Sequence, residues 1–297
     1  MNLSRNKKST SRVSVLFAVA ILIAAAIFYV ISLKNEESPL SDFSGEEISG
    51  KCEIHFIDVG QGDSTLFLCG ENSVLIDAGP RDSSEATRDY VCSQTDKIDY
   101  LILTHPDEDH IGGVPNVIRE LKIENIIMSD AVKDTSTFDK MLTAVEKSGA
   151  KVIKAVPGNT YTAGKLKLTV LAPIGSFEGD YNDYSVVTKV EFGDTSVLVT
   201  GDAEHNSENN MLEKYGNSLR SDVLKMGHHG SSTSSGEDFF RAVSPKIAVI
   251  SCGKDNSYGH PHKETLKLLR DTKTEFFRTD ENGTVVLVSD GKTVGNK

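Results

Sequence analysis

Short apolar runs separated by polar turns dominate the chain after its first fifty residues and predict a protein rich in β-strands. Runs of this length, bounded by Gly, Asn, Asp or Pro, are typical of strands buried in a sheet. In the first half we expect strands at residues 52–59, 64–68, 73–77, 100–103 and 125–128. In the second half we expect strands at residues 151–156, 165–171, 185–192, 196–200, 223–226, 247–251, 276–278 and 284–288.

Apolar residues with helical spacing occur between these runs. The strongest case is residues 136–148, where one face carries Phe138, Met141, Leu142 and Val145 at i, i+3, i+4 and i+7. Further helices are expected at residues 84–92, 112–121, 208–215, 237–243 and 261–269. Two strand-rich halves flanked by helices predict an α/β (α+β) fold class, arranged as a four-layered αββα sandwich rather than as a single parallel sheet.

The N-terminal segment contains a long run without charge. Residues 13–32 carry no charged side chain, and about twenty helical residues span the roughly 30 Å hydrocarbon core of a bilayer. Residues 1–12 are basic and lack acids, which keeps that end cytoplasmic. We therefore expect a cytoplasmic N-terminus at 1–12, a single transmembrane anchor at 13–32, a flexible stalk at 33–50 and an extracytoplasmic domain at 51–291. A cleavable signal peptide is the competing interpretation of residues 13–32.

The charge balance limits what the domain can bind through its surface alone. The 297 residues include 43 Asp and Glu and 32 Lys and Arg, for a formal net charge of −11. This balance argues against binding of nucleic acid through a broad basic surface. It leaves open a polyanionic substrate that is held by metal ions.

The four cysteines match no zinc-ribbon spacing. If Asp58 lies opposite Asp63 across a hairpin turn, then Cys52 falls opposite Cys69, and the two can form a disulfide. An external location would permit such a bridge. Free buried thiols are the alternative.

The stretch from Thr104 to Gly113, THPDEDHIGG, gathers the most chemistry in the chain. It follows an apolar run and holds four potential metal ligands within six residues: His105, Asp107, Asp109 and His110. Carboxylates and imidazoles packed this closely are costly to bury without a compensating charge. A metal ion supplies that charge, so the motif predicts a metal site on a strand-to-helix turn. A solvated acidic turn with two incidental histidines is the alternative.

Seven blocks of sequence across residues 51–290 together resemble the metallo-β-lactamase superfamily. They are FIDVGQGDS (56–64), LIDAG (75–79), LTHPDEDHIGG (103–113), YNDYSVV (181–187), LVTGDAE (198–204), DVLKMGHHGSSTSS (222–235) and SCGKDNSYGHPH (251–262). Within the superfamily, the chain most resembles the extracytoplasmic hydrolase domain of ComEC-type DNA-uptake proteins. The resemblance implies a metallo-β-lactamase sandwich, here as a stand-alone hydrolase domain on an anchor.

The resemblance implies a first metal site at the front of the motif. The superfamily pattern His-x-His-x-Asp-His has Asp107 in place of its second histidine. The first site would use His105, Asp107 and a bridging Asp202. The further histidine of the superfamily is not evident, and Asn182 or Asp183 lies in that region instead. A weak or empty first site is therefore an open alternative.

The implied second site is more complete. Its ligands would be Asp109, His110, Asp202 and one of His228 and His229, of which we expect His228 because it comes first after the apolar strand. The oxygen-rich ligand set brings Mn²⁺ into competition with Zn²⁺. We expect one or two divalent ions per chain, and two ions about 3.5–4 Å apart suit a phosphodiester.

Further roles follow from the same resemblance. Asp109 would be both a ligand and the group that orients the attacking water, and His260 would donate a proton to the leaving group or contact the substrate. Asp58 and Asp77 are expected to support ligands or cap turns. Expected substrate contacts are His229, Ser231, Ser232, Asn182 and Asp183. The loop at 229–232 could instead be an ordinary N-cap of the following helix.

The function implied is that of a membrane-anchored, metal-dependent phosphodiesterase or nuclease acting on DNA outside the cytoplasm. One alternative is hydrolysis of another external phosphoester, such as phosphocholine or a teichoic-acid unit, or of a lactone. Another is a catalytically weak module that binds DNA or an envelope partner. Because the acidic surface disfavours unaided capture of DNA, a separately encoded channel protein could act as a partner.

Overall fold

The computed structural model describes residues 50–177 and 179–297. The expected cytoplasmic N-terminus at 1–12, the anchor at 13–32 and nearly all of the stalk at 33–50 lie outside the described residues. Within the described ranges, no helix combines the length and the apolarity needed to cross a bilayer.

Two β-sheets form the centre of the molecule. The first has eight strands in the order β15-β14-β1-β2-β3-β4-β5-β6. Its strands β3 to β6 run parallel, while β15, β14, β1, β2 and β3 pair antiparallel. The bounds are β1 Cys52–Phe56, β2 Thr65–Cys69, β3 Asn72–Ile76, β4 Lys97–Leu103, β5 Lys122–Met128, β6 Lys151–Lys154, β14 Val285–Ser289 and β15 Val294–Asn296.

The second sheet has seven strands in the order β13-β12-β11-β10-β9-β8-β7. Strands β10 to β13 are parallel, so their carboxyl ends meet at one edge. The bounds are β7 Thr160–Ala163, β8 Leu166–Val170, β9 Thr188–Phe192, β10 Thr195–Val199, β11 Val223–Lys225, β12 Ile247–Ile250 and β13 Glu275–Arg278.

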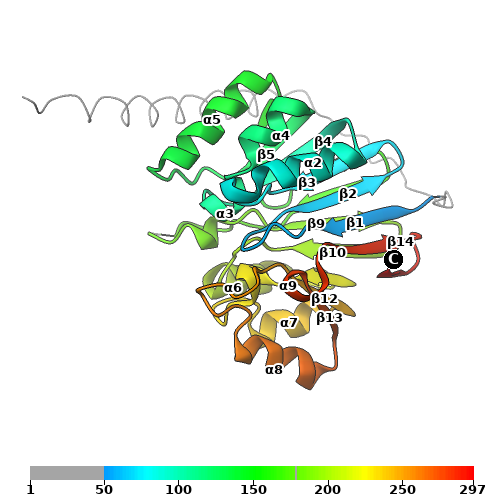
Figure 1. Ribbon diagram of the computed structural model, residues 1–297. Helices are drawn as coiled ribbons and strands as arrows, with labels where there is room; N and C mark the ends of the chain where they lie inside the picture. The colour runs from blue at the N-terminus through cyan, green and yellow to red at the C-terminus, as the bar shows by residue number, and fades with distance from the viewer. Residues whose placement is uncertain (1–49, 178) are drawn as a thin grey trace, which may run out of the picture.

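Helices cover the outer face of each sheet, which gives four layers (Figure 1). On the first sheet lie α2 (Ser84–Gln94), α4 (Val114–Glu120) and α5 (Ser136–Ser148), and on the second lie α6 (His205–Tyr215), α7 (Glu237–Val243) and α8 (Lys263–Thr272). Short helices α3 (Glu108–Ile111) and α9 (Thr279–Asn282) complete the set of α-helices that the described residues form.

Apolar side chains from both sheets meet in the middle of the sandwich. Phe56, Phe67 and Val249 belong to this central cluster and are almost completely buried. Two further clusters lie between each sheet and its own helices. The expected face of α5 is confirmed, since its buried residues are Phe138, Met141, Leu142 and Val145. The mixed α/β architecture that the sequence predicts, with two sheets between helical layers, is therefore confirmed.

The hairpin of β1 and β2 has the expected register. Cys52 lies opposite Cys69, with a Cα–Cα distance of 4.4 Å, and the two form a disulfide. Cys92 and Cys252 are free thiols. The disulfide therefore ties the ends of this hairpin together, as the pairing of residues across the turn predicts.

The helix expected at 112–121 begins earlier and is divided. Because α3 starts at Glu108, Asp109 and His110 lie on a helix rather than on the turn before it. A glycine pair then separates α3 from α4, and a Cβ atom at Gly113 would lie 2.1 Å from the carbonyl oxygen of Ala78. Strands β7 and β15 were not expected, because the first is largely polar and the second is short and contains Gly295.

Candidate metal centre

The potential ligands converge where strands of both sheets end. Residues 104–107 follow β4 and lead into α3, while Asp202 follows β10 in the other sheet. His228 and His229 follow β11. Loops at the carboxyl ends of parallel strands are a common position for active sites because a rigid sheet holds them. The sandwich therefore brings the two halves of the predicted site together.

Four fully buried side chains form the tightest cluster: Asp63, His110, Asp202 and His229. One ligand atom of each lies within 4.8 Å of the others. Our reading of the sequence missed Asp63, which ends the GQGD turn. The available signal was the glycine on either side of Gln61. Gly62 takes a φ of +148°, and a Cβ there would lie 2.4 Å from the carbonyl oxygen of Asp109, so this turn packs directly on α3.

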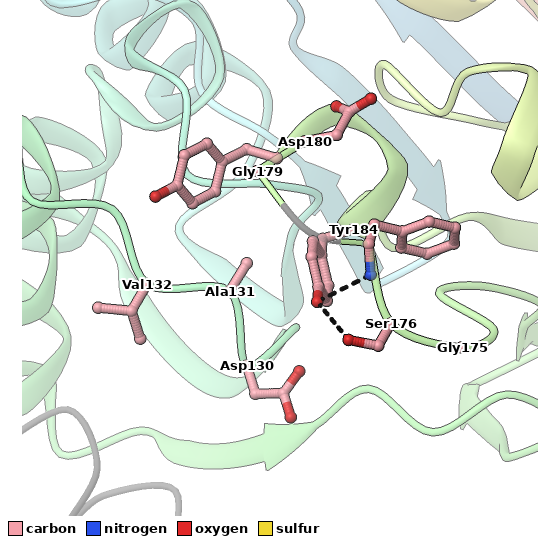
Figure 2. Close-up of a pocket in the computed structure, with 10 residues that line it drawn as sticks. Asp130, Ala131, Val132, Gly175, Ser176, Gly179, Asp180 and Tyr184 are labelled. Carbon is pink, nitrogen blue, oxygen red and sulfur yellow. Dashed lines mark hydrogen bonds between the residues drawn. The ribbon is translucent and has the colours of Figure 1, made fainter.

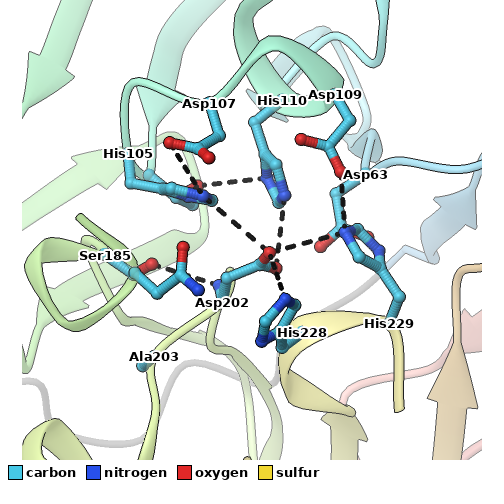
Figure 3. A network of polar contacts seen from close by, with 12 residues as sticks. Asp63, His105, Asp107, Asp109, His110, Ser185, Asp202, Ala203, His228 and His229 are labelled. Carbon is cyan, nitrogen blue, oxygen red and sulfur yellow. Dashed lines mark hydrogen bonds and ion pairs between the residues drawn. The ribbon is translucent and has the colours of Figure 1, made fainter. Parts of the chain in front are cut away.

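Asp202 lies at the centre of the site, between imidazoles from both halves of the chain (Figure 3). Its Oδ1 is 3.2 Å from Nε2 of His110. Its Oδ2 is 3.5 Å from Nε2 of His229 and 3.8 Å from Nε2 of both His105 and His228. This central position is the one expected of a carboxylate that bridges two metal sites.

His105 and Asp107 lie at one side of Asp202, where the first site was expected. Nε2 of His105 is 3.9 Å from Oδ1 of Asp107. The same Oδ1 also accepts a hydrogen bond of 2.7 Å from Nζ of Lys133. Lys133 therefore supplies a positive charge beside the first site.

Asp77 orients His110. Its Oδ2 is 2.8 Å from Nδ1 of His110, and its two oxygens also accept hydrogen bonds from the backbone N–H and hydroxyl of Thr104. This arrangement favours a proton on Nδ1 and leaves Nε2 for a metal ion, which is the usual second interaction of a histidine ligand. Asp77 therefore supports a ligand, as expected, whereas the exposed Asp58 accepts from the N–H of Gly60 and caps the turn.

His229 is oriented in a similar way. Its Nδ1 lies 3.0 Å from the carbonyl oxygen of Ser251 and 3.3 Å from Oδ1 of Asp63, while its Nε2 lies 3.1 Å from Oδ2 of Asp109. The completely buried Lys225 holds Asp63 through a 2.7 Å ion pair. One backbone acceptor and one side-chain acceptor therefore lie at Nδ1 of His229, and its Nε2 faces the carboxylates.

Both histidines of the pair reach Asp202, so the structure adds His229 as a candidate ligand beside the expected His228. The His228 side chain is 24% exposed, and its Nδ1 lies 2.9 Å from Oε1 of Glu204, whereas the His229 side chain is 2% exposed and faces Asp109. Both residues have positive φ, 49° and 54°. Two successive left-handed residues turn the chain tightly, and the Nε2 atoms of both rings approach Oδ2 of Asp202, at 3.5 Å for His229 and 3.8 Å for His228.

The carboxylates and imidazoles of the cluster shift one another's pKa values. Burial alone would raise the pKa of Asp202, but His229 and His110 outweigh it and hold that pKa well below its usual range. Burial alone would lower the pKa of His110 and of His229, but Asp202 and its neighbouring carboxylates raise both well above the usual value. The described residues thus gather positive charge around Asp202.

The donor atoms fit a divalent cation. Within the described part of the chain, Nε2 of His105, Nε2 of His110 and Oδ1 of Asp202 are buried and make no hydrogen bond of good geometry. Buried polar atoms are normally satisfied, and these atoms converge on one place. Imidazole nitrogen together with carboxylate oxygen suits both Zn²⁺ and Mn²⁺. The candidate ligands are Asp63, His105, Asp107, Asp109, His110, Asp202, His228 and His229.

The two expected substrate contacts Asp183 and Asn182 differ in their surroundings, since Asn182 bonds to Glu204, the partner of His228. Both oxygens of the buried Asp183 accept hydrogen bonds at the start of α6, from the backbone of Glu204 and Ser207 and from the side chain of Asn206. Asp183 therefore caps that helix and does not face the cluster. Nδ2 of Asn182 donates to Oε1 of Glu204.

The loop after His229 is braced internally. Oγ of Ser231 lies 3.0 Å from Oγ1 of Thr233, and the backbone N–H of Ser232 donates to Nδ1 of His262. His262 precedes α8 as its N-cap residue. Ser232 remains exposed, so it can still meet a substrate. The loop thus has a structural role in which His262 takes part.

His260 lies beside the cluster. Its ring centroid is 5.4 Å from that of His228 and 6.2 Å from that of His229. Burial, together with the neighbouring imidazoles, lowers the pKa of His260 to about 4. A histidine with this pKa is neutral at pH 7, so in the metal-free protein it is better suited to substrate contact than to proton donation.

Figure 2 shows a cleft whose volume is about 520 Å³. It is lined by segments 130–132 and 175–177 together with Tyr181 and Tyr184. Nζ of Lys133 lies 5.0 Å from the ring centroid of Tyr181. Asp130 and Asp180 also line the cleft, and Asp130 forms an ion pair with Nζ of Lys154.

Comparison with known proteins agrees with this geometry. Residues 57–254 match the family described as the metallo-beta-lactamase superfamily. The chain is 33% identical over 258 residues to ComE operon protein 3 of Bacillus subtilis (strain 168), covering 80% of this chain and 33% of that protein. It is 31% identical over 228 residues to competence protein ComA of Neisseria gonorrhoeae, covering 76% and 30%. The chain thus spans about a third of the length of these curated relatives.

Among solved structures, the metallo-beta-lactamase fold protein YhfI of Bacillus subtilis superposes with a TM-score of 0.53 at 17% identity, covering 76% of this chain and 95% of that one. This likeness concerns the fold. Together with the family match over residues 57–254 and the cluster around Asp202, it leads to one conclusion. The chain belongs to the metallo-beta-lactamase superfamily, and its relatives include competence proteins of the ComEC type.

Proposed function

We propose that this protein is a metal-dependent phosphodiesterase that cleaves DNA outside the cytoplasm during DNA uptake. The observation that carries the proposal is the position of Asp202, which lies within 3.8 Å of imidazole nitrogens on both sides. A divalent ion bound there would polarise phosphoryl oxygens and make water more acidic. Relatives that are named as competence proteins support DNA as the substrate.

The chain's own residues have definite tasks in this proposal. Asp109, held by Nε2 of His229, is a ligand and orients the attacking water. Lys133, at the outer side of Asp107, offers a positive charge to a phosphoryl oxygen. His260, buried beside His228, contacts the substrate.

The proposed location is the outer face of the cytoplasmic membrane, with residues 13–32 as a single-pass anchor. The Cys52–Cys69 disulfide supports this location, because such bridges persist outside the reducing cytoplasm. A separately encoded channel protein is the proposed partner. It would bring DNA to a domain whose net charge of −11 disfavours unaided capture.

The test is the loss and recovery of cleavage in the full-length chain. Chelation should abolish hydrolysis of bis-p-nitrophenyl phosphate and of linear DNA, and Mn²⁺ or Zn²⁺ should restore both. Asp202→Asn should lower both metal affinity and cleavage by more than about 100-fold, because it removes the shared carboxylate. Asp194→Asn is the matched control, since the exposed Asp194 lies at the opposite end of β10.

Three outcomes distinguish the candidate functions. Equal cleavage by wild type and Asp202→Asn would refute the proposed mechanism. Cleavage of the small ester without cleavage of DNA would indicate another external phosphoester as the substrate. Metal binding without cleavage of either would indicate a binding module.

A further inference from the structure

Tyr258 stands out among the apolar side chains of the described residues. It is 65% exposed, and no other large hydrophobic side chain in the described ranges is comparably open to solvent. It lies in the loop between β12 and α8, within the segment NSYGHPH. Single exposed aromatic residues are common and need no explanation by themselves. What distinguishes Tyr258 is that its ring contacts other rings that lead toward the metal centre.

Tyr258 forms the outer end of a series of rings that leads to the metal centre. Its ring stacks on His260, with centroids 5.6 Å apart and an interplanar angle of 21°. The His260 ring lies 5.4 Å from His228, whose Nε2 is 3.8 Å from Oδ2 of Asp202. Two ring-to-ring steps therefore connect an exposed aromatic face to a histidine beside the central carboxylate.

The loop that carries Tyr258 is held in place by hydrogen bonds. Nδ2 of Asn256 donates to the carbonyl oxygens of Gly253 and His260, at 2.8 and 2.6 Å, and its Oδ1 accepts from the N–H of His260 at 3.0 Å. Nε2 of His262 lies 3.3 Å from the carbonyl oxygen of Tyr258. An aromatic ring on a braced loop loses little conformational freedom when it binds, which favours a role in recognition.

We propose that Tyr258 is a stacking platform for the nucleobase next to the scissile phosphate, so that the preferred substrate is a nucleic-acid strand with unpaired bases. This inference rests on the proposed phosphodiesterase function. Every base presents a π-face that can stack on an aromatic side chain whatever the sequence. Bases inside a duplex already stack on one another, so only an unpaired strand presents its faces to Tyr258.

Docking of an apolar protein partner is a weaker explanation for the exposed ring. Protein interfaces of this kind need a contiguous apolar patch of several hundred Å². The residues that precede Tyr258 in the loop are polar, Lys254 to Ser257, and the described surface has no second exposed large hydrophobic side chain to extend a patch. A single aromatic face between polar neighbours suits one base better than it suits a protein surface.

The test compares two single-stranded decamers, one of thymidine and one with the same backbone but abasic tetrahydrofuran residues. The full-length wild type, Tyr258→Ala, Tyr258→Phe and Tyr258→Trp are assayed for kcat/KM on both. Tyr258→Ala should lower kcat/KM for the thymidine decamer by about 5- to 150-fold, the range for loss of one stacked base. It should leave the abasic decamer unchanged, and Phe and Trp should retain most of the activity.

The two proposals fail in different ways. If wild type cleaves both decamers and Tyr258→Ala matches it on each, the platform is refuted while the phosphodiesterase function stands. If Tyr258→Ala loses equally on both decamers, Tyr258 contacts the backbone or supports the loop, and the platform is again refuted. If wild type with Mn²⁺ or Zn²⁺ cleaves neither decamer nor bis-p-nitrophenyl phosphate, both proposals are refuted.

Discussion

Replacing Asp77 by Asn tests whether a residue behind the metal centre determines how tightly the centre binds its ion. Asp77 has a φ of 58°, a conformation that Asn adopts readily, so the backbone should not change. The substitution keeps the side-chain volume but removes the charge that holds Nδ1 of His110 at 2.8 Å. His110 is then free to rotate or to move its proton to Nε2, where it would block metal binding.

The contacts of Asp77 allow two quantities to be estimated, the loss of metal affinity and the loss of stability. Loss of a carboxylate behind a histidine ligand costs about 10- to 100-fold in metal affinity, or about 1.4–2.7 kcal/mol. Asp77 also accepts two hydrogen bonds from Thr104, at 2.9 and 2.6 Å. A hydrogen bond to a charged group contributes about 1.5–3 kcal/mol, so the free energy of unfolding of the metal-free protein should fall by a similar amount.

The assay is competition for Zn²⁺ or Mn²⁺ with a chromophoric chelator, together with urea denaturation of the metal-free protein. Asp99→Asn is a matched control, because Asp99 is 6% exposed and accepts from the N–H of Ser73 at 2.9 Å but lies at the other end of β4. It should lower stability and leave metal affinity within about twofold. The reasoning would be refuted if Asp77→Asn kept wild-type affinity, or if Asp99→Asn lost as much.

Three further predictions concern ligand choice and the cysteines. His229→Ala should lower the metal content of the purified protein, measured by plasma mass spectrometry, more than His228→Ala, because Nε2 of His229 is 3.1 Å from Asp109; the reverse order would favour His228 as the ligand. The double variant Cys52→Ser, Cys69→Ser should lose about 3 kcal/mol in urea denaturation, since the bridge closes a loop with a sequence separation of 17; unchanged stability would argue against the bridge. Burial, reinforced by the hydrogen bond to Asp280, raises the pKa of Cys252 to about 12. At pH 8 only about one Cys252 thiol in ten thousand is therefore ionised. In a Cys92→Ser background, the rate at which Cys252 reacts with a disulfide reagent should rise about tenfold per pH unit below pH 11. Fast reaction of Cys252 at pH 8 would contradict this expectation.

Local patterns were sufficient for much of the fold. The spacing of Phe138, Met141, Leu142 and Val145 indicates the buried face of α5, because a helix repeats its faces every 3.6 residues. The pairing of Cys52 with Cys69 follows from counting outward from the hairpin turn. Both features depend on residues close in sequence, for which backbone geometry leaves few alternatives.

The position where α3 begins could not be predicted in this way. The acidic stretch before Gly112 has no apolar stripe from which a helix start can be recognised. In the structure α3 starts at Glu108 and packs on the GQGD turn, where the N–H of Asp63 donates to the carbonyl oxygen of Asp109 at 3.2 Å. The two segments are far apart in the sequence, so no local pattern indicates this contact.

By itself, the sequence determined which residue types are available for the site and that they follow apolar strands: His105 to His110 after β4, Asp202 after β10 and the histidine pair after β11. Only the tertiary structure decided which of them meet. Asp109 and His229 are 120 residues apart and lie within 3.1 Å because two sheets pack face to face with their loops at one edge. The same packing brings Asp63 into the cluster, where Lys225 of the opposing sheet pairs with it, since a buried charged group needs a partner that compensates its charge.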